Sequence, residues 1–400
     1  MIQVFNKKED CCGCSACQSI CPKSAISFKQ DNCGFFYPDV DNSKCIECGL
    51  CKQVCSFSDP LSERKLHNTK SYVVKHRIEE VVKDSRSGGV FTAVSDDILN
   101  NGGVVYGVLL DKDLVVRHAR ATTKEERDEF RKSKYVQSIL EDVFGDVIKD
   151  LKNGKTVLFS GTPCQCDGVK HYVEKMKISA DNLILCDLVC HSSASPGLFY
   201  NYLRYQERKY KQKIIDFYFR DKKKYNWMEH VEKIEFENGK VTYTDEYTNM
   251  FFSDNIRPSC FKCKYTSLNR VSDLTMADCW GGQNVYPDIV DNKTGASLVL
   301  VNTEKGNRLL LESVNDIILK NIDIEKVMQP RFKECEKKSN TYEQFWSDYN
   351  SLPFDIFMKK YGHNNYSIGS VTVRKLKSLF KLPAMIVEIV WRKYIMRKGR

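Results

Sequence analysis

The 400-residue sequence lacks the long apolar run of a membrane-spanning helix, since no apolar stretch approaches the roughly 18 residues required. Its first residues, MIQVFNKKED, lack the apolar core of a secretory signal. A broad excess of one charge is also missing. The net charge is +10, but residues 371–400 hold nine Lys or Arg and one acid, which leaves +2 elsewhere. The missing apolar run excludes an integral membrane protein, and the nearly neutral body of the chain excludes a broad nucleic-acid-binding surface. The missing signal predicts a cytoplasmic location.

Cysteine, by contrast, is abundant, with 18 residues. A secreted chain of this kind would form disulfides, but in the absence of an export signal we expect reduced thiols that serve as ligands. Two runs stand near the start of the chain, CCGCSACQSICP at residues 11–22 and CIECGLCKQVC at residues 45–55. Both follow the spacing C-x2-C-x2-C-x3-C.

This spacing is typical of bacterial ferredoxins that hold two 4Fe-4S clusters, in which the fourth cysteine of each run binds the other run's cluster. One predicted ligand set is Cys11, Cys14, Cys17 and Cys55, and the other is Cys45, Cys48, Cys51 and Cys21. The alternatives are a pair of zinc sites, which usually come as separated C-x2-C pairs, or a disulfide framework. Gly13 and Gly49 fall where the backbone must bend close to a cluster. Cys12 is an additional thiol with no assigned role.

The chain divides into four predicted parts. Residues 1–58 form an α+β ferredoxin-like domain, and the polar residues 59–70 form a linker. Residues 71–330 alternate strand and helix signals, which indicates an α/β domain. Its signals include a capping box at Thr123 and Glu126 and a hairpin turn at Asn238–Gly239. After a strand near residues 296–306 we expect helical sequence, so residues 331–400 are predicted to be a helical, basic extension.

Four further cysteines follow strand-like segments of the α/β domain, namely Cys164, Cys190, Cys260 and Cys263. Because they stand at the ends of separate segments, they can converge on a third cluster. The alternative is that they are buried structural cysteines, since a free thiol packs as a small hydrophobic group. A buried structural role is the better interpretation of the other four cysteines outside the ferredoxin-like domain, which are Cys166, Cys186, Cys279 and Cys335.

Several segments, in order, carry a family resemblance: SGGVFTAV, RKSKYVQS, LFSGTPCQ, CDLVCH, RPSCFKCKY, SDLTMADCWGG and GASLVLVNT. Together they resemble the beta subunit of coenzyme F-420 hydrogenase/dehydrogenase, in the long bacterial form that follows a two-cluster ferredoxin domain. The resemblance covers about residues 1 to 305. It implies that residues 71–330 are a flavin and iron–sulfur domain, and that Cys164, Cys190, Cys260 and Cys263 hold one 4Fe-4S cluster.

The resemblance also implies FAD beside that cluster. The positions carried over are Ser87, Gly88, Gly89, Thr92, Lys134, Tyr135, Gln137 and Ser138. A glycine pair before a helix suits a pyrophosphate, because free N–H groups and the helix dipole face the ligand. The SGG turn is not the G-x-G-x-x-G fingerprint, so an ordinary dinucleotide-binding site is not expected.

Four other residues have two interpretations each. His191 is a weak candidate for a proton donor, or a loop histidine with satisfied hydrogen bonds. Arg257 and Arg270 either bind an anionic substrate or lie on the surface. Trp280 packs either on a cofactor ring or in the core. No catalytic residue is assigned with these alternatives open.

The tail, VTVRKLKSLFKLP followed by AMIVEIVWRKYIMRKGR, consists of two short amphipathic pieces with Lys and Arg at their ends. This composition is typical of an interfacial helix on anionic lipid, which would give peripheral contact with the inner membrane face. The alternative is a C-terminal helix that packs on the body or on a partner.

Iron–sulfur clusters pass single electrons, whereas a flavin transfers one electron or a hydride. The resulting hypothesis is an iron–sulfur flavoprotein oxidoreductase that takes electrons from a ferredoxin-type donor or a partner redox subunit. Its acceptor would be a deazaflavin or a small organic molecule. The alternatives are a non-catalytic electron-transfer subunit of a larger redox complex and, with least support, a redox sensor.

Overall fold

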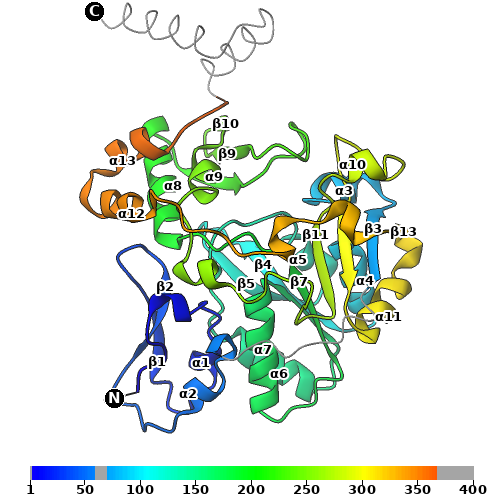
Figure 1. Ribbon diagram of the computed structural model, residues 1–400, viewed down its shortest axis with the longest axis horizontal. Helices are drawn as coiled ribbons and strands as arrows, with labels where there is room; N and C mark the ends of the chain where they lie inside the picture. The colour runs from blue at the N-terminus through cyan, green and yellow to red at the C-terminus, as the bar shows by residue number, and fades with distance from the viewer. Residues whose placement is uncertain (1, 59–69, 367–400) are drawn as a thin grey trace, which may run out of the picture.

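The computed structural model describes residues 2–58 and 70–366 (Figure 1). The predicted linker covers residues 59–70, and the predicted amphipathic tail covers residues 371–400. Both predictions lie outside the described residues except at Lys70, which begins a strand.

The N-terminal region is a small α+β unit built around a hairpin. Its elements are η1 (Lys8–Asp10), α1 (Ala16–Ser19), β1 (Ile26–Gln30), β2 (Phe36–Val40), α2 (Leu50–Gln53) and η2 (Ser56–Ser58). Strands β1 and β2 pair antiparallel. Gly13 and Gly49 have φ of 76° and 75°, the left-handed region in which glycine is favoured. The backbone therefore bends at both positions where the sequence predicted it.

An eight-stranded sheet forms the centre of the second domain, in the order β13-β3-β12-β11-β7-β6-β4-β5. Strands β4, β6, β7 and β11 are parallel neighbours, and the remaining pairs are antiparallel. The bounds are β3 (Lys70–His76), β4 (Val104–Leu110), β5 (Val116–Ala121), β6 (Val157–Gly161), β7 (Leu183–Leu188), β11 (Leu274–Asp278), β12 (Ser297–Val301) and β13 (Ile317–Asn321). The fold is thus a mixed α/β domain behind a ferredoxin-like region.

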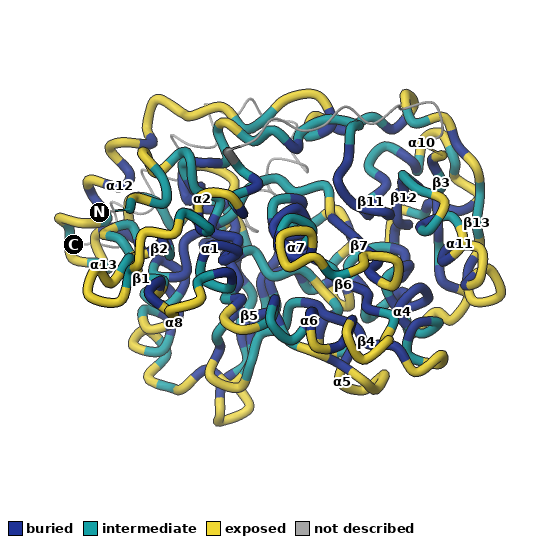
Figure 2. The backbone as a smooth tube through the Cα atoms, turned by 90° about the horizontal axis from the view of Figure 1, so that it is seen from below, coloured by how far each residue is buried: buried dark blue, intermediate teal, exposed yellow. Residues whose placement is uncertain are grey.

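Helices cover this sheet and connect its strands. They are α3 (Glu79–Asp84), α4 (Val90–Asn100), α5 (Lys124–Asp128), α6 (Val143–Lys152), α7 (Pro163–Lys175), α10 (Gly282–Val285) and α11 (Glu304–Glu312). Helix α5 begins at the predicted capping box, in which the Thr123 side chain accepts from the Glu126 N–H. Figure 2 shows that the buried segments run mainly through the middle of the molecule and the exposed ones mainly along its rim.

A second, aromatic-rich layer surrounds a three-stranded sheet of β8 (Ile214–Tyr218), β9 (Glu232–Phe236) and β10 (Val241–Thr244). Helices α8 (Pro196–Tyr210), α9 (Glu246–Phe251), α12 (Tyr342–Ser351) and α13 (Phe354–Tyr361) contribute to the same apolar cluster. As predicted, β9 and β10 join through Asn238–Gly239, and Gly239 has φ of 79°.

One sequence prediction about the eight-stranded sheet is wrong. Helical sequence was expected after β12, but residues 317–321 form strand β13, which pairs antiparallel with β3 at the edge of the sheet. Only Ile317 of this strand is fully buried, whereas Ile318 is exposed. An edge strand of this kind presents little of the apolar alternation on which strand prediction depends.

The N-terminal region packs tightly against the second domain. Helix α1 lies beside α6 and α7. At the hairpin turn, the Gly197 N–H donates to the Gly34 carbonyl at 3.1 Å, and a Cβ on Gly197 would lie 2.7 Å from the Gly34 Cα. Arg257, which is fully buried, donates from Nε to the Cys11 carbonyl at 2.9 Å. Within residues 2–58 and 70–366, no helix has the length and hydropathy to cross a bilayer.

Candidate functional site

The first predicted ligand set converges at α1. Burial raises the pKa of the Cys17 thiol, and the neighbouring thiols of Cys14, Cys11, Cys55 and Cys51 raise it further. Burial likewise raises the pKa of Cys11, partly offset by the positive charge of Arg257. The structure therefore brings Cys55, from the second run, to the three cysteines of the first run. That is the exchange expected of a two-cluster ferredoxin.

The second set also comes together in this region. Cys21, Cys45, Cys48 and Cys51 line one small pocket together with the apolar side chains of Ile26 and Val40. Burial raises the pKa of Cys51, and the thiols of Cys48 and Cys45 also raise it. Cys48 is exposed, so this set is the one nearer to solvent.

The third set converges from three segments of the α/β domain. Cys164 is the second residue of α7, just beyond β6; Cys190 follows β7; and Cys260 and Cys263 lie in and directly after η4 (Pro258–Lys262). Burial raises the pKa of the Cys190 thiol, and the neighbouring thiols of Cys260, Cys164 and Cys263 raise that pKa further. Strands β6 and β7 are parallel, so their carboxyl ends bring the first two thiols to one edge of the sheet.

These surroundings fit clusters better than single ions. Within the described part of the chain, no three Cys, His, Asp or Glu side chains are arranged to hold one metal ion. A cubane spans several atoms, so its four cysteine ligands surround a larger volume than a zinc ion requires. The Cys164 thiol raises the pKa of Cys190, Cys260 and Cys263, and the Cys263 thiol raises the pKa of Cys190 and Cys260. Bound iron would therefore have to stabilise several neighbouring thiolates together. That these cysteines are ligands remains a prediction.

The additional thiol, Cys12, lies between the first and third sets. Its hydrogen bonds with Cys14 and Cys164 raise its own pKa and lower theirs. The bond with Cys12 is the largest cause that lowers the pKa of Cys164, to about 7. Neither the position nor the contacts of Cys12 were predicted from the sequence, because its neighbour Cys11 already completes the ferredoxin spacing.

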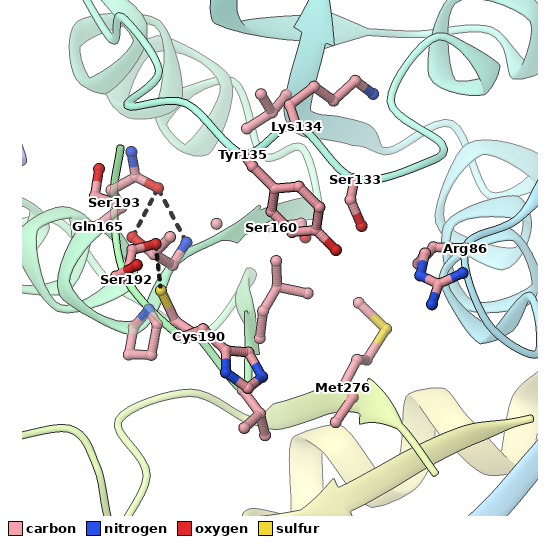
Figure 3. A pocket seen from close by; sticks show the side chains of 18 of the residues that line it. Arg86, Ser133, Lys134, Tyr135, Ser160, Gln165, Cys190, Ser192, Ser193 and Met276 are labelled. Carbon is pink, nitrogen blue, oxygen red and sulfur yellow. Dashed lines mark hydrogen bonds between the residues drawn. The ribbon is translucent and has the colours of Figure 1, made fainter. Parts of the chain in front are cut away.

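A cavity of about 340 Å³ adjoins the third set (Figure 3). All four of its cysteines line this cavity, as do seven of the eight residues predicted to bind flavin, namely Ser87, Gly89, Thr92, Lys134, Tyr135, Gln137 and Ser138. The lining is predominantly apolar, which suits an aromatic cofactor held by a few polar groups. The structure thus gathers the predicted residues, although it does not test their role.

The glycine turn at the cavity is asymmetric. Gly89 is the N-cap of α4 in the left-handed region, with φ of 86°, whereas Gly88 faces the sheet. A Cβ on Gly88 would lie 2.2 Å from the Val74 carbonyl oxygen and 2.6 Å from the Ser297 nitrogen. Gly88 is therefore required for close packing of the turn on β3 and β12, while Ser87 and Gly89 border the cavity.

Two of the polar residues are already engaged by the protein. The Lys134 ammonium donates to the carbonyls of Glu129 and Arg131 at 2.9 and 2.5 Å, and its side chain points away from Tyr135 in Figure 3. Burial lowers the pKa of Lys134 to about 7. Thr92 accepts from Arg131 Nε at 3.1 Å. In this arrangement Lys134 holds its own loop rather than facing the cavity with a free charge.

The remaining three residues differ in what they contact. The Tyr135 ring stacks on Phe251 with centroids 4.8 Å apart, and its hydroxyl lies on the cavity side (Figure 3). Ser138 lies 2.9 Å from His118 Nδ1 and accepts from Gln165 at 2.9 Å. Gln137 contacts the N-terminal region instead.

The Gln137 side chain accepts from the Phe36 N–H at 3.2 Å and from Arg257 Nη1 at 3.0 Å. Its Nε2 would clash with a Cβ on Gly13, at 2.4 Å. Gln137 therefore joins the cavity loop to the ferredoxin-like region.

Sequence reasoning missed three of the four arginines that line the cavity, Arg86, Arg131 and Arg220. Arg86 Nη2 donates to Asp278 Oδ2 at 3.2 Å and to the Trp227 carbonyl, while its Nε and Nη1 are buried with no partner among the described residues. Arg220 donates to the Tyr135 hydroxyl at 3.1 Å. The only signal in the sequence was the position of Arg86 directly before the SGG turn.

The surface interpretation of Arg257 and Arg270 is wrong, since both are buried. Binding of an anionic substrate by either arginine stays a prediction, and Arg257 is among the residues that line the cavity. Arg270 is buried in an ion pair with Asp187, with Nη2 to Oδ1 at 2.8 Å. Arg257 is held by Cys11 and Gln137 and lies over the Tyr37 ring at 4.0 Å. These arginines stabilise the fold around the cysteines.

His191 and Trp280 both line the cavity, with ring centroids 5.0 Å apart. Burial lowers the pKa of His191. Of the cysteines expected to be structural, Cys166, Cys186 and Cys279 are fully buried in apolar clusters, and the Cys335 thiol donates to the Phe261 carbonyl at 3.1 Å.

Two family models match this chain. Residues 10–58 match the 4Fe-4S dicluster domain, and residues 154–327 match the C terminus of the coenzyme F420 hydrogenase/dehydrogenase beta subunit. Over residues 154–327, the chain is similar to the coenzyme F420 hydrogenase/dehydrogenase beta subunit. The resemblance inferred from the sequence is confirmed, and the family match includes all four cysteines of the third set.

Two curated relatives of this chain are named for coenzyme F420. The coenzyme F420-dependent sulfite reductase of Methanocaldococcus jannaschii is 25% identical over 377 residues, covering 86% of this chain and 53% of that protein. One of the subunits of the F420H2 dehydrogenase of Methanosarcina mazei is 20% identical over 192 residues, covering 46% and 54%. The chain thus spans about half the length of the curated relatives it matches.

Among solved structures, a chain of the F420-reducing NiFe hydrogenase complex from Methanosarcina barkeri is similar to this chain. The two are 16% identical, with a TM-score of 0.44, and the match covers 80% of this chain and 96% of the other.

Proposed function

We propose that the protein is an iron–sulfur flavoprotein oxidoreductase. It would relay single electrons from a ferredoxin-type donor through three 4Fe-4S clusters to FAD, and on to a deazaflavin or small organic substrate. One observation carries the proposal: all four cysteines of the third set line the 340 Å³ cavity. A cluster bound by those thiols would border whatever the cavity holds.

Bound flavin would supply the conversion between single electrons and hydride transfer. The chain's own residues would hold and orient it. Tyr135, fixed by Phe251 and Arg220, offers a flat aromatic wall, and the unpartnered Arg86 nitrogens offer charge for a phosphate. His191 remains the candidate for a proton donor because it lines the cavity beside Trp280.

A second candidate is a non-catalytic electron-transfer subunit of a larger redox complex. It is favoured by the similarity to one subunit of an F420H2 dehydrogenase. In that case the purified chain would show no turnover alone and would co-purify with a larger redox partner.

Anaerobic purification with iron, sulfide and flavin quantification tests the main proposal. We expect roughly 12 iron and about one FAD per chain. Cys164→Ser should remove about 4 iron, because it deletes one ligand of the third set. The matched control, Cys33→Ser, lies outside all three sets and should keep the full content. Roughly 8 iron without flavin in the unmodified protein would contradict both the third cluster and the flavoprotein assignment.

A further inference from the structure

A chain of hydrogen bonds joins one cysteine of the third set to the buried side chain of His118. The Thr162 hydroxyl lies 3.2 Å from Cys164 Sγ and donates to Gln165 Oε1 at 2.9 Å. The Gln165 amide nitrogen donates to Ser138 Oγ at 2.9 Å, and that oxygen lies 2.9 Å from His118 Nδ1. All of these residues except His118 line the 340 Å³ cavity, among them Gln165 (Figure 3). One network therefore runs from a predicted cluster ligand along the cavity wall.

The far end of this network is rigid. His118, Ser138 and Gln165 have exposed fractions of only 4%, 6% and 7%, and the His118 ring stacks on Phe159 with centroids 5.2 Å apart. The Thr162 backbone N–H also donates to Gln165 Oε1, at 3.0 Å. A reversed Gln165 amide would place its NH2 group against that N–H. The oxygen of this amide therefore faces Thr162, and it has a backbone donor that does not depend on the hydroxyl.

The Thr162 hydroxyl has one proton and two neighbours that can accept it, Gln165 Oε1 and Cys164 Sγ. While Cys164 is a thiol, its S–H can donate to the hydroxyl oxygen, and the hydroxyl can donate to Gln165. A cysteine that binds iron is a thiolate, which has no proton to donate. With the hydroxyl proton still directed at Gln165, two electron-rich atoms would face each other at 3.2 Å.

A small rotation of the hydroxyl removes this conflict. When its proton points to Cys164 Sγ, the thiolate gains a donor, and Gln165 Oε1 keeps the Thr162 N–H. Every group then remains paired, and a hydrogen bond to a charged acceptor is stronger than one to a neutral acceptor. The geometry therefore favours donation to the sulfur once the cysteine is a ligand.

We propose that Thr162 is a positioning residue for the third cluster, whose reduction potential it raises by donating a hydrogen bond to Cys164 Sγ. An added electron increases the negative charge on the ligand sulfurs, so a donor at Sγ stabilises the reduced cluster more than the oxidised one. The inference rests on the proposed function, since it concerns the cluster that would exchange electrons with the occupant of the cavity.

The test is a redox titration of the full anaerobic chain, monitored by electron paramagnetic resonance. The signal of the third cluster is the one that Cys164→Ser removes. Thr162→Val keeps the branched shape but lacks the donor. It should make one-electron reduction of this cluster about tenfold less favourable, which corresponds to a potential lower by about 59 mV. Thr162→Ser restores a hydroxyl and should titrate like the unmodified chain.

Gln165→Met is the matched control, because it alters the same first turn of α7 but leaves Cys164 as an acceptor for the Thr162 hydroxyl. Its third cluster should be no harder to reduce than in the unmodified chain. An equally lowered potential in Gln165→Met and Thr162→Val would indicate a general disturbance of the turn and would overturn the proposal. An unchanged potential in Thr162→Val would overturn it as well.

Iron content, measured in each sample, separates this inference from the proposed function. Roughly 8 iron in the unmodified chain would contradict the third cluster, and both proposals would fail. Roughly 12 iron with the same potential in Thr162→Val would reject the role of Thr162 alone. If Thr162→Val does not assemble the cluster, Thr162→Ala gives the same comparison without the added methyl groups. Loss of the cluster from both, with Thr162→Ser intact, would also overturn the proposal, because the hydroxyl would then be needed for assembly.

Discussion

At the scale of single residues, Arg257 is the clearest link between the two domains. It is completely buried, and its guanidinium contacts the Cys11 carbonyl, the Gln137 amide and the Tyr37 ring. A buried guanidinium is stable only when its donors are paired. These three contacts reach both the first cysteine set and the loop that lines the 340 Å³ cavity, so one side chain fixes their relative position.

Arg257→Met should therefore destabilise the protein by about 2–4 kcal/mol, because the Cys11 carbonyl and the Gln137 oxygen would lose a buried donor. Arg257→Lys should recover only part of this loss, since an ammonium cannot replace the planar fork. Anaerobic urea unfolding measures both effects. The control is Arg208→Met on α8, whose partner Asp355 is also exposed, and it should cost less than about 1 kcal/mol. A similar loss in the two methionine variants would refute this account of Arg257.

At the scale of elements, the hairpin of β1 and β2 meets the start of α8 without intervening side chains. Gly34 and Gly197 face each other, with the projected Cβ of Gly197 within 2.7 Å of the opposing Cα. The adjacent Ser195 both caps α8 and donates to the Cys33 carbonyl at 2.6 Å. Backbone packed on backbone leaves no flexible group to move aside.

Gly197→Ala should consequently cost about 1–3 kcal/mol, since the added methyl has to separate the hairpin from α8. Gly145→Ala provides the matched control, because Gly145 lies within α6 and a Cβ there meets no atom within 4 Å. That substitution should stabilise the protein by up to about 1 kcal/mol through helix propensity. The two midpoints in urea should shift in opposite directions, and a shift in the same direction would show that the contact is not tight.

Element-scale features also show how far the sequence could be interpreted. The capping box of Thr123 and the turn at Asn238–Gly239 are local signals, and both are found where predicted. Strand β13 depends on pairing with β3, far away in the chain, so its own residues carry little signal. The third cysteine set could be suspected because Cys164 and Cys190 follow strands β6 and β7. Cys260 and Cys263 were also expected after a strand-like segment, but they lie in and directly after η4, which follows helix α9. The site arginine Arg86 could not be suspected, because a lone arginine shows its unpaired nitrogens only after folding.

At the scale of the whole molecule, stability depends on buried ionisable groups as well as on packing. Glu232 of β9 is completely buried, accepts from the Tyr202 hydroxyl at 2.9 Å and from the Thr248 N–H at 2.5 Å, and has its pKa raised by burial to about 8. The folded protein therefore keeps this carboxyl protonated under conditions in which the unfolded chain ionises it.

Because the folded pKa exceeds the unfolded one, the stabilising contribution of Glu232 is complete at pH values below about 4.5 and is lost as the pH rises to about 8. Within that window the slope for one such group reaches about 1.4 kcal/mol per pH unit. Glu232→Gln should flatten the dependence and raise stability at pH 8 relative to the unmodified chain. Anaerobic thermal unfolding at pH 6 and pH 8 measures the change. Glu235→Gln, on the same strand and paired with Lys233, should leave the slope as it was.

The position of Cys12 has a kinetic consequence for the proposed relay. Its thiol contacts one cysteine from each of two sets, Cys14 in the N-terminal region and Cys164 in the α/β domain. Together with the Gly34–Gly197 contact, this leaves the N-terminal region no room to swing between a donor and the cavity. Electrons would pass between the two domains at a rate that does not depend on solvent viscosity or on protein concentration. The N-terminal region would then be an electron carrier in a fixed position, whereas a ferredoxin on a flexible tether has to diffuse to its partner before each transfer.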